Sequence, residues 1–236
     1  MQKSALIIVG NEILSGRTQD KNIQHIGEKM ALHGVPLAEV RVVPDIEDRI
    51  VEAVNTLRPL YEFVFTTGGL GPTHDDITAA CIAKAFGVEL EQNKEAYKEL
   101  EKHYGTDELT TARLKMAQMP VGAQLIDNPV SGAPGFFMEN VYTMAGIPRI
   151  MQAMLDDVLN KIEDGDPVIS KSMIFDMPES VIAERLGSIQ HKFPDVEIGS
   201  YPNFRNGKLW TCIVMRATDE TRLDEVFADV EALMVG

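Results

Sequence analysis

Short apolar runs alternate with helical spacings of apolar side chains over the first third of the chain. Residues 4–10 form a continuous apolar run, as expected of a strand that is buried on both faces of a sheet. A helix is predicted at 23–34, a strand at 37–43, a helix at 46–57 and a strand at 62–67. Three successive strand–helix steps predict a parallel, doubly covered sheet with right-handed crossovers.

The middle of the chain is richer in helical spacing. It predicts three helices peripheral to the sheet, at 73–86, 94–103 and 109–119. Pro120 ends the last of them, because proline cannot continue a helix. Two strand-like runs, 136–138 and 141–144, then predict a hairpin, and Pro148 opens a helix over 150–162.

A polar Gly/Pro segment at 164–167 is the best candidate for a domain boundary. It predicts a large α/β domain, 1–164, and a small α+β domain, 165–236. The smaller domain is expected to run strand, helix, strand, strand, helix, at 168–175, 179–190, 196–201, 209–217 and 220–234.

The net charge and the cysteines indicate which binding partners and which cellular compartment to expect. The 236 residues contain 22 Lys+Arg and 36 Asp+Glu, which gives a formal charge of −14. A surface this acidic argues against nucleic acid and anionic membranes as partners, because both require clustered cations. Cys81 and Cys212 form no metal-ligand or CxxC spacing, and the apolar run near the N-terminus is too short for a signal peptide or a membrane span. We therefore expect a cytoplasmic protein with reduced thiols.

The strongest chemical signal is a glycine-rich loop at 66–76, between a predicted strand and a predicted helix. Gly68, Gly69 and Gly71 allow the backbone to approach a ligand closely, and the N-terminus of the following helix offers free N–H groups. The loop lacks the lysine of a P-loop and does not fit the dinucleotide fingerprint. It predicts a binding site for phosphate or another anion.

Two acidic residues, Asp75 and Asp76, follow that loop and allow two interpretations. In one, they complement the helix dipole while Thr73 caps the helix. In the other, they bind a divalent cation, because carboxylates beside a phosphate site would otherwise repel the ligand. His74 is interpreted as a solvated turn residue.

Two further clusters complete the candidate site. Residues 10–22 follow the first strand, and the carboxyl ends of parallel strands share one edge of a sheet, so Glu12, Asp20 and Asn22 are expected near the glycine loop. Asp20 could equally be a helix cap, and Asp45 is a weaker candidate of the same kind. Residues 128–136 form either the opposite wall of the pocket or a plain surface turn.

Covalent catalysis is not indicated by any motif. The chain has no G-x-S-x-G, no H-E-x-x-H and no Cys–His pair at an informative spacing. Water activated by a metal ion is therefore the better hypothesis if the protein is an enzyme.

These clusters resemble the molybdopterin-binding (molybdenum-cofactor biosynthesis) domain family, and most closely its branch in competence/damage-inducible protein A (CinA). The matching motifs are GNEILSG at 10–16, TGGLGPTHDDIT at 67–78, GAPGF at 132–136 and GIP at 146–148. The segment after 168 resembles the small α+β domain that follows in CinA, while the amidase domain of full-length CinA is missing.

The resemblance implies a three-layer α/β/α fold with a mostly parallel sheet, and a pocket for a phosphorylated pterin or a nucleotide. It implies a divalent metal (Mg²⁺, Mn²⁺ or Co²⁺), a possible molybdopterin ligand and a homo-oligomer, either a dimer or a trimer. Leu70 stands where the adenylylating branch has threonine, which is more similar to relatives associated with hydrolysis of nucleotide pyrophosphates such as ADP-ribose or FAD.

The predicted site follows from the motifs and the resemblance together. We expect Asp75, Asp76 and Glu12 to be catalytic and Asp75, Asp76 and Asp20 to bind the metal. The residues expected to bind the ligand are Gly68, Gly69, Gly71, Thr73, Asn22, Gly132, Gly135 and Pro148.

Two positions depart from the family pattern. Asn11 stands where the family usually has aspartate, and Ile150 stands where it usually has glutamate. The loss of these carboxylates favours an alternative, a pterin- or nucleotide-binding module without turnover. A third hypothesis is adenylyl transfer to molybdopterin, which Leu70 disfavours.

Overall fold

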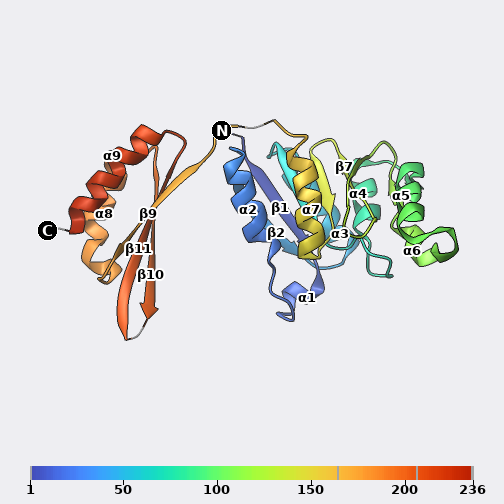
Figure 1. Cartoon of the computed structure of the whole chain (residues 1–236), viewed down its shortest axis with the longest axis horizontal. Helices are drawn as coiled ribbons and strands as arrows, with labels where there is room; N and C mark the ends of the chain where they lie inside the picture. Colours follow the sequence, from blue (N-terminus) through green and yellow to red (C-terminus); the bar gives the residue numbers. More distant parts are fainter. Residues whose placement is uncertain (1, 164, 206, 235–236) are drawn as a thin grey trace. The chain divides into compact units, whose positions relative to one another are not determined.

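The computed structural model describes residues 2–163, 165–205 and 207–234. The chain folds into two compact units, Met1–Gly165 and Asp166–Gly236 (Figure 1). Each unit has its own buried cluster of apolar side chains.

The first unit is built on a six-stranded sheet in the order β2-β1-β3-β8-β7-β6. Its strands are β1 (Ser4–Val9), β2 (Leu37–Val43), β3 (Phe63–Thr67), β6 (Gln124–Ile126), β7 (Gly135–Met138) and β8 (Val141–Met144). Strands β2, β1, β3 and β8 are parallel, whereas β7 and β6 are antiparallel to their neighbours. The mostly parallel sheet and the hairpin that ends it confirm the predicted fold class.

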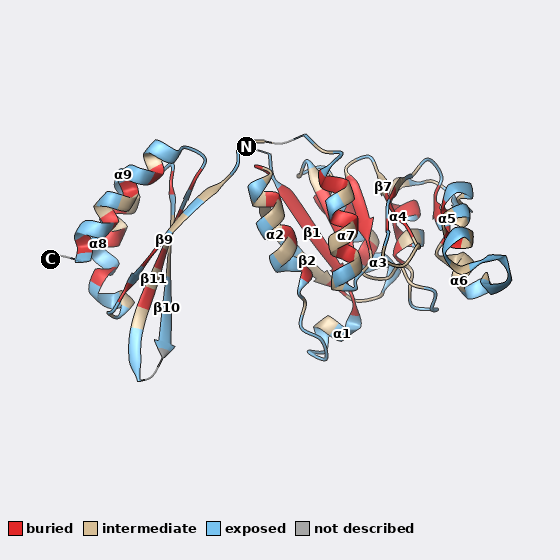
Figure 2. Cartoon of the chain, viewed as in Figure 1, coloured by how far each residue is buried: buried red, intermediate tan, exposed pale blue. Residues whose placement is uncertain are grey.

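Helices cover both faces of this sheet, which gives three layers. Helices α2 (Asn22–Leu32) and α7 (Pro148–Leu159) pack on one face, and α3 (Glu47–Leu57) and α4 (Thr78–Phe86) pack on the other. Every residue of β1 is buried, and its side chains alternate between the two apolar clusters (Figure 2). That explains why the first strand is a continuous apolar run.

The predicted helix at 73–86 was wrong at its start. Helix α4 begins only at Thr78, and residues 68–77 form a loop that folds back onto that start. Thr78 donates its N–H to the carbonyl oxygen of Gly69 (3.1 Å) and its hydroxyl to that of Gly68 (2.9 Å). Since the loop supplies these partners, the helix needs no cap from Thr73.

The predicted helix at 109–119 was right only in part. A short helix, α6 (Thr111–Lys115), lies inside it and follows a 3-10 turn, η1 (Thr106–Glu108). The end of the predicted helix belongs instead to a strand, β5 (Gln118–Pro120), that pairs with β4 (Leu90–Gln92). Pairing of β5 with β4, which is distant in sequence, outweighs the helical spacing of apolar residues in this segment. Helix α1 (Asn11–Leu14), which follows β1, and helix α5 (Lys94–Tyr104), which contacts α6, complete the unit.

The second unit is a three-stranded antiparallel sheet in the order β10-β11-β9, with α8 and α9 packed on it through one apolar cluster. Its elements are β9 (Ile169–Phe175), α8 (Glu179–Lys192), β10 (Glu197–Arg205), β11 (Lys208–Ala217), α9 (Glu220–Glu231) and the 3-10 turn η2 (Ala232–Met234). Their order is the one expected from the sequence. Across the described residues of both units, no helix combines the length and apolarity needed to cross a bilayer.

Candidate functional site

A cavity of about 660 Å³ opens at the carboxyl ends of the central parallel strands. Val9 at the end of β1, Gly68 after β3 and Ala145 after β8 all line it. Loops that are far apart in sequence meet here because the carboxyl ends of parallel strands share one edge of the sheet. The cavity contains Glu12 and the glycine loop together, as the sequence predicted.

Four carboxylates line this cavity, from Glu12, Asp45, Asp75 and Asp76. The Oδ2 atom of Asp45 accepts a hydrogen bond from the backbone N–H of Asn11 at 2.8 Å, which fixes its carboxylate at the end of β2. Asp45, the weaker candidate by sequence, therefore belongs to the site. The Asn11 side chain does not line the cavity.

Asp75 and Asp76 converge on one hydroxyl group. The Oγ1 atom of Thr73 lies 2.5 Å from Oδ2 of Asp76 and also contacts Oδ1 of Asp75. The N–H of Thr73 donates to the same Oδ2 of Asp76 at 2.8 Å. A hydroxyl has one proton to donate, so it cannot satisfy both carboxylates at once. The hydrogen bond from Thr73 holds the pKa of Asp75 below its usual value.

The glycine loop is shaped by close packing as well as by the cavity. Gly68 and Gly69 have positive φ angles of 98° and 64°. A Cβ atom on Gly68 would overlap the carbonyl oxygen of Val9, and one on Gly69 would overlap the hydroxyl of Thr78. On Gly71 it would lie 2.6 Å from Oδ2 of Asp76. The loop therefore exposes backbone to the cavity, but the first amide of α4 is already bonded to the loop and is not free for an anion.

Asp20 and Asn22 lie outside the cavity lining. Oδ1 of Asp20 accepts hydrogen bonds from the N–H groups of Asn22 and Ile23, both at 2.8 Å, so Asp20 caps the start of α2. The structure supports the alternative interpretation of Asp20 as a cap, and Asp20 is not among the residues that line the cavity, which gives no support to its role as a metal ligand. Asn22 is buried, and its Nδ2 donates to the carbonyl oxygen of Gly146 at 2.9 Å.

Gly132 and Gly135 also lie beside the cavity and do not line it, whereas Pro148 does. Gly132 has a φ of 70°, and a Cβ there would overlap the side chain of His103. A Cβ on Gly135 would lie 2.6 Å from the carbonyl oxygen of Thr143. These two glycines allow close packing, and their neighbours Ser131, Ala133 and Pro134 form the wall.

Part of the wall comes from helices that the sequence assigned to the periphery. Tyr104 from α5 and Arg113 from α6 line the cavity, together with Met116. The guanidinium carbon of Arg113 lies 4.3 Å from the centre of the Tyr104 ring. No local sequence signal marks these residues, because only the path of the chain through α5 and α6 brings them to the sheet edge.

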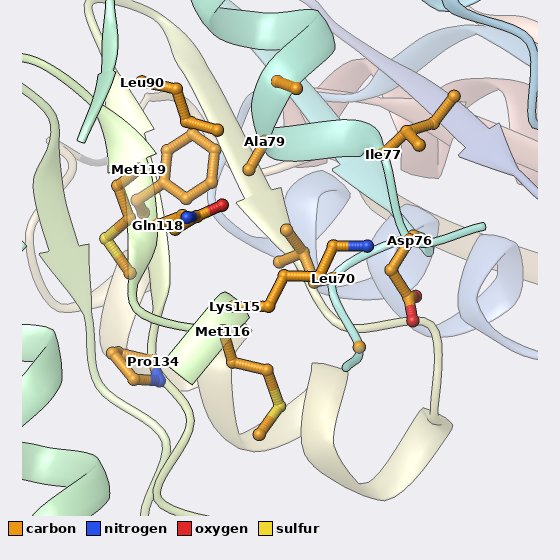
Figure 3. Close-up of a pocket in the computed structure, with 14 residues that line it drawn as sticks. Leu70, Asp76, Ile77, Ala79, Leu90, Lys115, Met116, Gln118, Met119 and Pro134 are labelled. Atoms are coloured by element: carbon orange, nitrogen blue, oxygen red, sulfur yellow. The ribbon is translucent and has the colours of Figure 1, made fainter. Parts of the chain in front are cut away.

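A smaller, mostly apolar recess of about 100 Å³ adjoins the cavity. The residues that line both are Gly69, Leu70, Gly71, Asp76, Met116 and Pro134. Figure 3 shows Asp76 on one side of the recess and Leu90 and Met119 on the other. Both volumes are thus bordered by the glycine loop.

The donor set fits a divalent cation that is only partly enclosed by protein. Among the residues that the structure describes, no group of three or more His, Cys, Asp or Glu side chains is placed to hold a metal ion. The Asp75–Asp76 pair supplies two hard carboxylates instead. Mg²⁺ is commonly held by one or two carboxylates, with water and substrate phosphate as its other ligands. A site of that kind is compatible with this pair.

Comparisons with known proteins agree with the fold and the site motifs. Residues 5–164 match the family described as "probable molybdopterin binding domain", and residues 167–235 match the middle domain of FAD synthase. A protein of Archaeoglobus fulgidus is 37% identical over 199 residues, which cover 84% of either chain. A protein of Thermoplasma acidophilum is 35% identical over 210 residues, covering 86% of this chain and 81% of the relative.

A solved structure supports the same family assignment. The crystal structure of the protein CinA, of unknown function, from Thermoplasma acidophilum has a TM-score of 0.65 and 36% identity. The match covers 68% of this chain and 97% of that one. This chain belongs to the molybdopterin-binding domain family, in which it is similar to CinA.

Proposed function

We propose that this protein is a divalent-metal-dependent hydrolase of a nucleotide pyrophosphate, with ADP-ribose or FAD as the substrate type. The observation that carries the proposal is the convergence of the Asp75 and Asp76 carboxylates on the hydroxyl of Thr73, beside a loop of exposed backbone. Two carboxylates so close together favour a cation between them and an anionic ligand. The match of residues 167–235 to a domain of FAD synthase supports a nucleotide substrate.

Different residues of the cavity would bind the cation, orient the water and bind the phosphates. Asp75 and Asp76 would hold the cation, Glu12 or Asp45 would orient the attacking water, and the backbone of Gly68, Gly69 and Gly71 would face the phosphates. A divalent cation bound there would offset phosphate charge and make water a better nucleophile. The water oxygen bonds to one phosphorus, the bridging P–O bond breaks, and two phosphate monoesters leave as protons pass to solvent.

The test is hydrolysis of ADP-ribose and FAD with Mg²⁺, Mn²⁺ or Co²⁺, measured as AMP release against an EDTA control. Asp75→Asn and Asp76→Asn should each lower kcat by at least about 100-fold, because each loses a charged ligand. Asp48→Asn is the matched control, since Asp48 is an exposed acid on α3 that does not line the cavity. AMP release that survives Asp76→Asn in folded protein would reject the assignment.

One observation favours a second candidate, a binding module without turnover. Ile150 lines the cavity, so the carboxylate that the family usually has there is missing from the site itself. This candidate predicts that AMP and molybdopterin-like ligands raise the Tm without any metal, and that no AMP is released from either substrate. Under both candidates we propose a homo-oligomer, a dimer or a trimer, which light scattering would test.

A further inference from the structure

The cavity carries strongly unbalanced charge. Four carboxylates line it, from Glu12, Asp45, Asp75 and Asp76, and Arg113 is the one cationic side chain among its described lining residues. Lys115 lies nearby, but it lines the smaller recess and donates its Nζ to the carbonyl oxygen of Thr73. Among the described residues that line this cavity, Arg113 is therefore the cationic side chain that an anionic ligand would contact.

Arg113 is held in place by two neighbours. Its Nη1 donates to the carbonyl oxygen of Glu108 at 2.6 Å and to Oε2 of the same residue at 2.8 Å. Its guanidinium stacks over the ring of Tyr104. Both contacts fix the plane of the guanidinium before any ligand binds, and a fixed plane loses less entropy on binding.

Part of the guanidinium is still available. The side-chain hydrogen bonds that Arg113 makes to described residues both use Nη1, which leaves Nη2 and Nε without a described partner. None of the four cavity carboxylates forms an ion pair with Arg113, whose ion pair is with Glu108. The guanidinium of Arg113 therefore lies farther than ion-pair distance from each of the four cavity carboxylates.

We propose that Arg113, supported by Tyr104, binds the second phosphate of a diphosphate ligand and so selects diphosphates over monophosphates. The inference rests on the proposed function, in which the glycine loop and the cation held by Asp75 and Asp76 bind the first phosphate. Guanidinium groups bind phosphate oxygens through paired, charge-assisted hydrogen bonds. A volume of about 660 Å³ lies in the range of cavities that enclose nucleotide-sized ligands.

The test is binding, so it does not require turnover. Calorimetry with Mg²⁺ would compare α,β-methylene-ADP, whose bridge cannot be hydrolysed, with AMP. Arg113→Gln should weaken binding of the methylene diphosphate by about 10- to 100-fold, the usual range for a charge-assisted contact, and change AMP binding by less than about threefold. Arg113→Lys should give an intermediate loss, and Tyr104→Leu a smaller loss of the same preference.

Arg49→Gln is the matched control. Arg49 is also paired to a nearby glutamate, its side chain is exposed on α3, and it does not line the cavity. Circular dichroism and Tm establish that each variant folds, and Arg113→Lys serves if Arg113→Gln does not fold. Equal losses for AMP and the diphosphate analogue, an unchanged preference in Arg113→Gln, or a wild type without any preference would overturn the inference. A wild type that releases no AMP but keeps an Arg113-dependent preference would reject only the hydrolase proposal.

Discussion

The side-chain amide of Asn22 donates a hydrogen bond of 2.9 Å to the carbonyl oxygen of Gly146, across 124 residues of sequence. Asn22 begins α2, and Gly146 lies in the loop after β8 that forms the Gly146–Pro148 wall of the cavity. Asn22 is 2% exposed, so the donor side of this bond is shielded from water. Asn22 thus shapes the cavity from behind its wall and need not touch the ligand.

Asn22→Ala should lower the free energy of unfolding by about 0.5–1.5 kcal/mol, because it removes the hydrogen bond from the buried Asn22 side chain to Gly146. Denaturant unfolding of the wild type and the variant measures this. Asn55→Ala is the control, since Asn55 is exposed on α3, and its change should stay within about 0.5 kcal/mol. Equal stability of Asn22→Ala and wild type would show that the bond contributes nothing.

Gly68→Ala should destabilise the protein by at least about 1–3 kcal/mol, since φ is 98° there and the new Cβ would overlap the carbonyl oxygen of Val9. Gly27→Ala is a matched control in the same unit. Gly27 lies inside α2, where the nearest atom to a new Cβ is 3.9 Å away. That change should stabilise by about 0.5–1 kcal/mol, so thermal melts should move in opposite directions.

Ile150→Glu should strengthen Mn²⁺ binding, because it adds a carboxylate to the wall of the cavity. Asn11→Asp should change Mn²⁺ affinity little, as the Asn11 side chain does not line the cavity. Titration of Mn²⁺ followed by electron paramagnetic resonance compares the two variants. A stronger gain in Asn11→Asp than in Ile150→Glu would show that the metal lies elsewhere.

The two thiols should differ in reactivity. Cys81 is buried, and burial raises its pKa to about 12, whereas Cys212 is partly exposed. At pH 8 a thiol reagent should modify Cys212 in native protein and reach Cys81 only after unfolding. Cys212→Ser should then leave no rapidly reacting thiol, and rapid labelling of that variant would contradict the burial of Cys81.

Cys81 should also make stability depend on alkaline pH. In the unfolded chain the thiol ionises near pH 9, whereas in the folded chain it stays protonated up to about pH 12. The free energy of unfolding should therefore fall as pH rises from about 9 to 12, by up to about 1.4 kcal/mol per pH unit. Cys81→Ala should remove that part of the slope, as denaturant unfolding at pH 8 and pH 10 would show.

The spacing of apolar residues along the chain was sufficient to predict the strands and helices whose buried positions recur at regular intervals. The apolar run at 4–9 indicated a strand buried on both faces, and the spacing at 47–57 indicated a helix with one buried face, as observed in β1 and α3. The motif order likewise indicated that Glu12 and the glycine loop would meet, because parallel strands end at one sheet edge. These inferences need only neighbouring residues and the geometry of a parallel sheet.

Other features depend on contacts between distant segments. The pairing of β4 with β5 converted Gln118–Pro120 from a predicted helix end into a strand, and the folding of the glycine loop onto Thr78 delayed α4 by five residues from its predicted start at Thr73. Local spacing favours a helix in both places, but burial and pairing with residues far away in sequence outweigh it.

The α/β fold, the acidic pair and the glycine loop could be predicted from the order of residues alone, because each depends on residues that are close together in the chain. The structure was needed to decide between a cap and a metal ligand at Asp20. The support of the cavity wall by Asn22 and the entry of Arg113 and Tyr104 into the site depend on contacts between distant segments, which local pattern does not encode. A residue's type and spacing set what chemistry it can perform, while the path of the whole chain sets which cavity it faces.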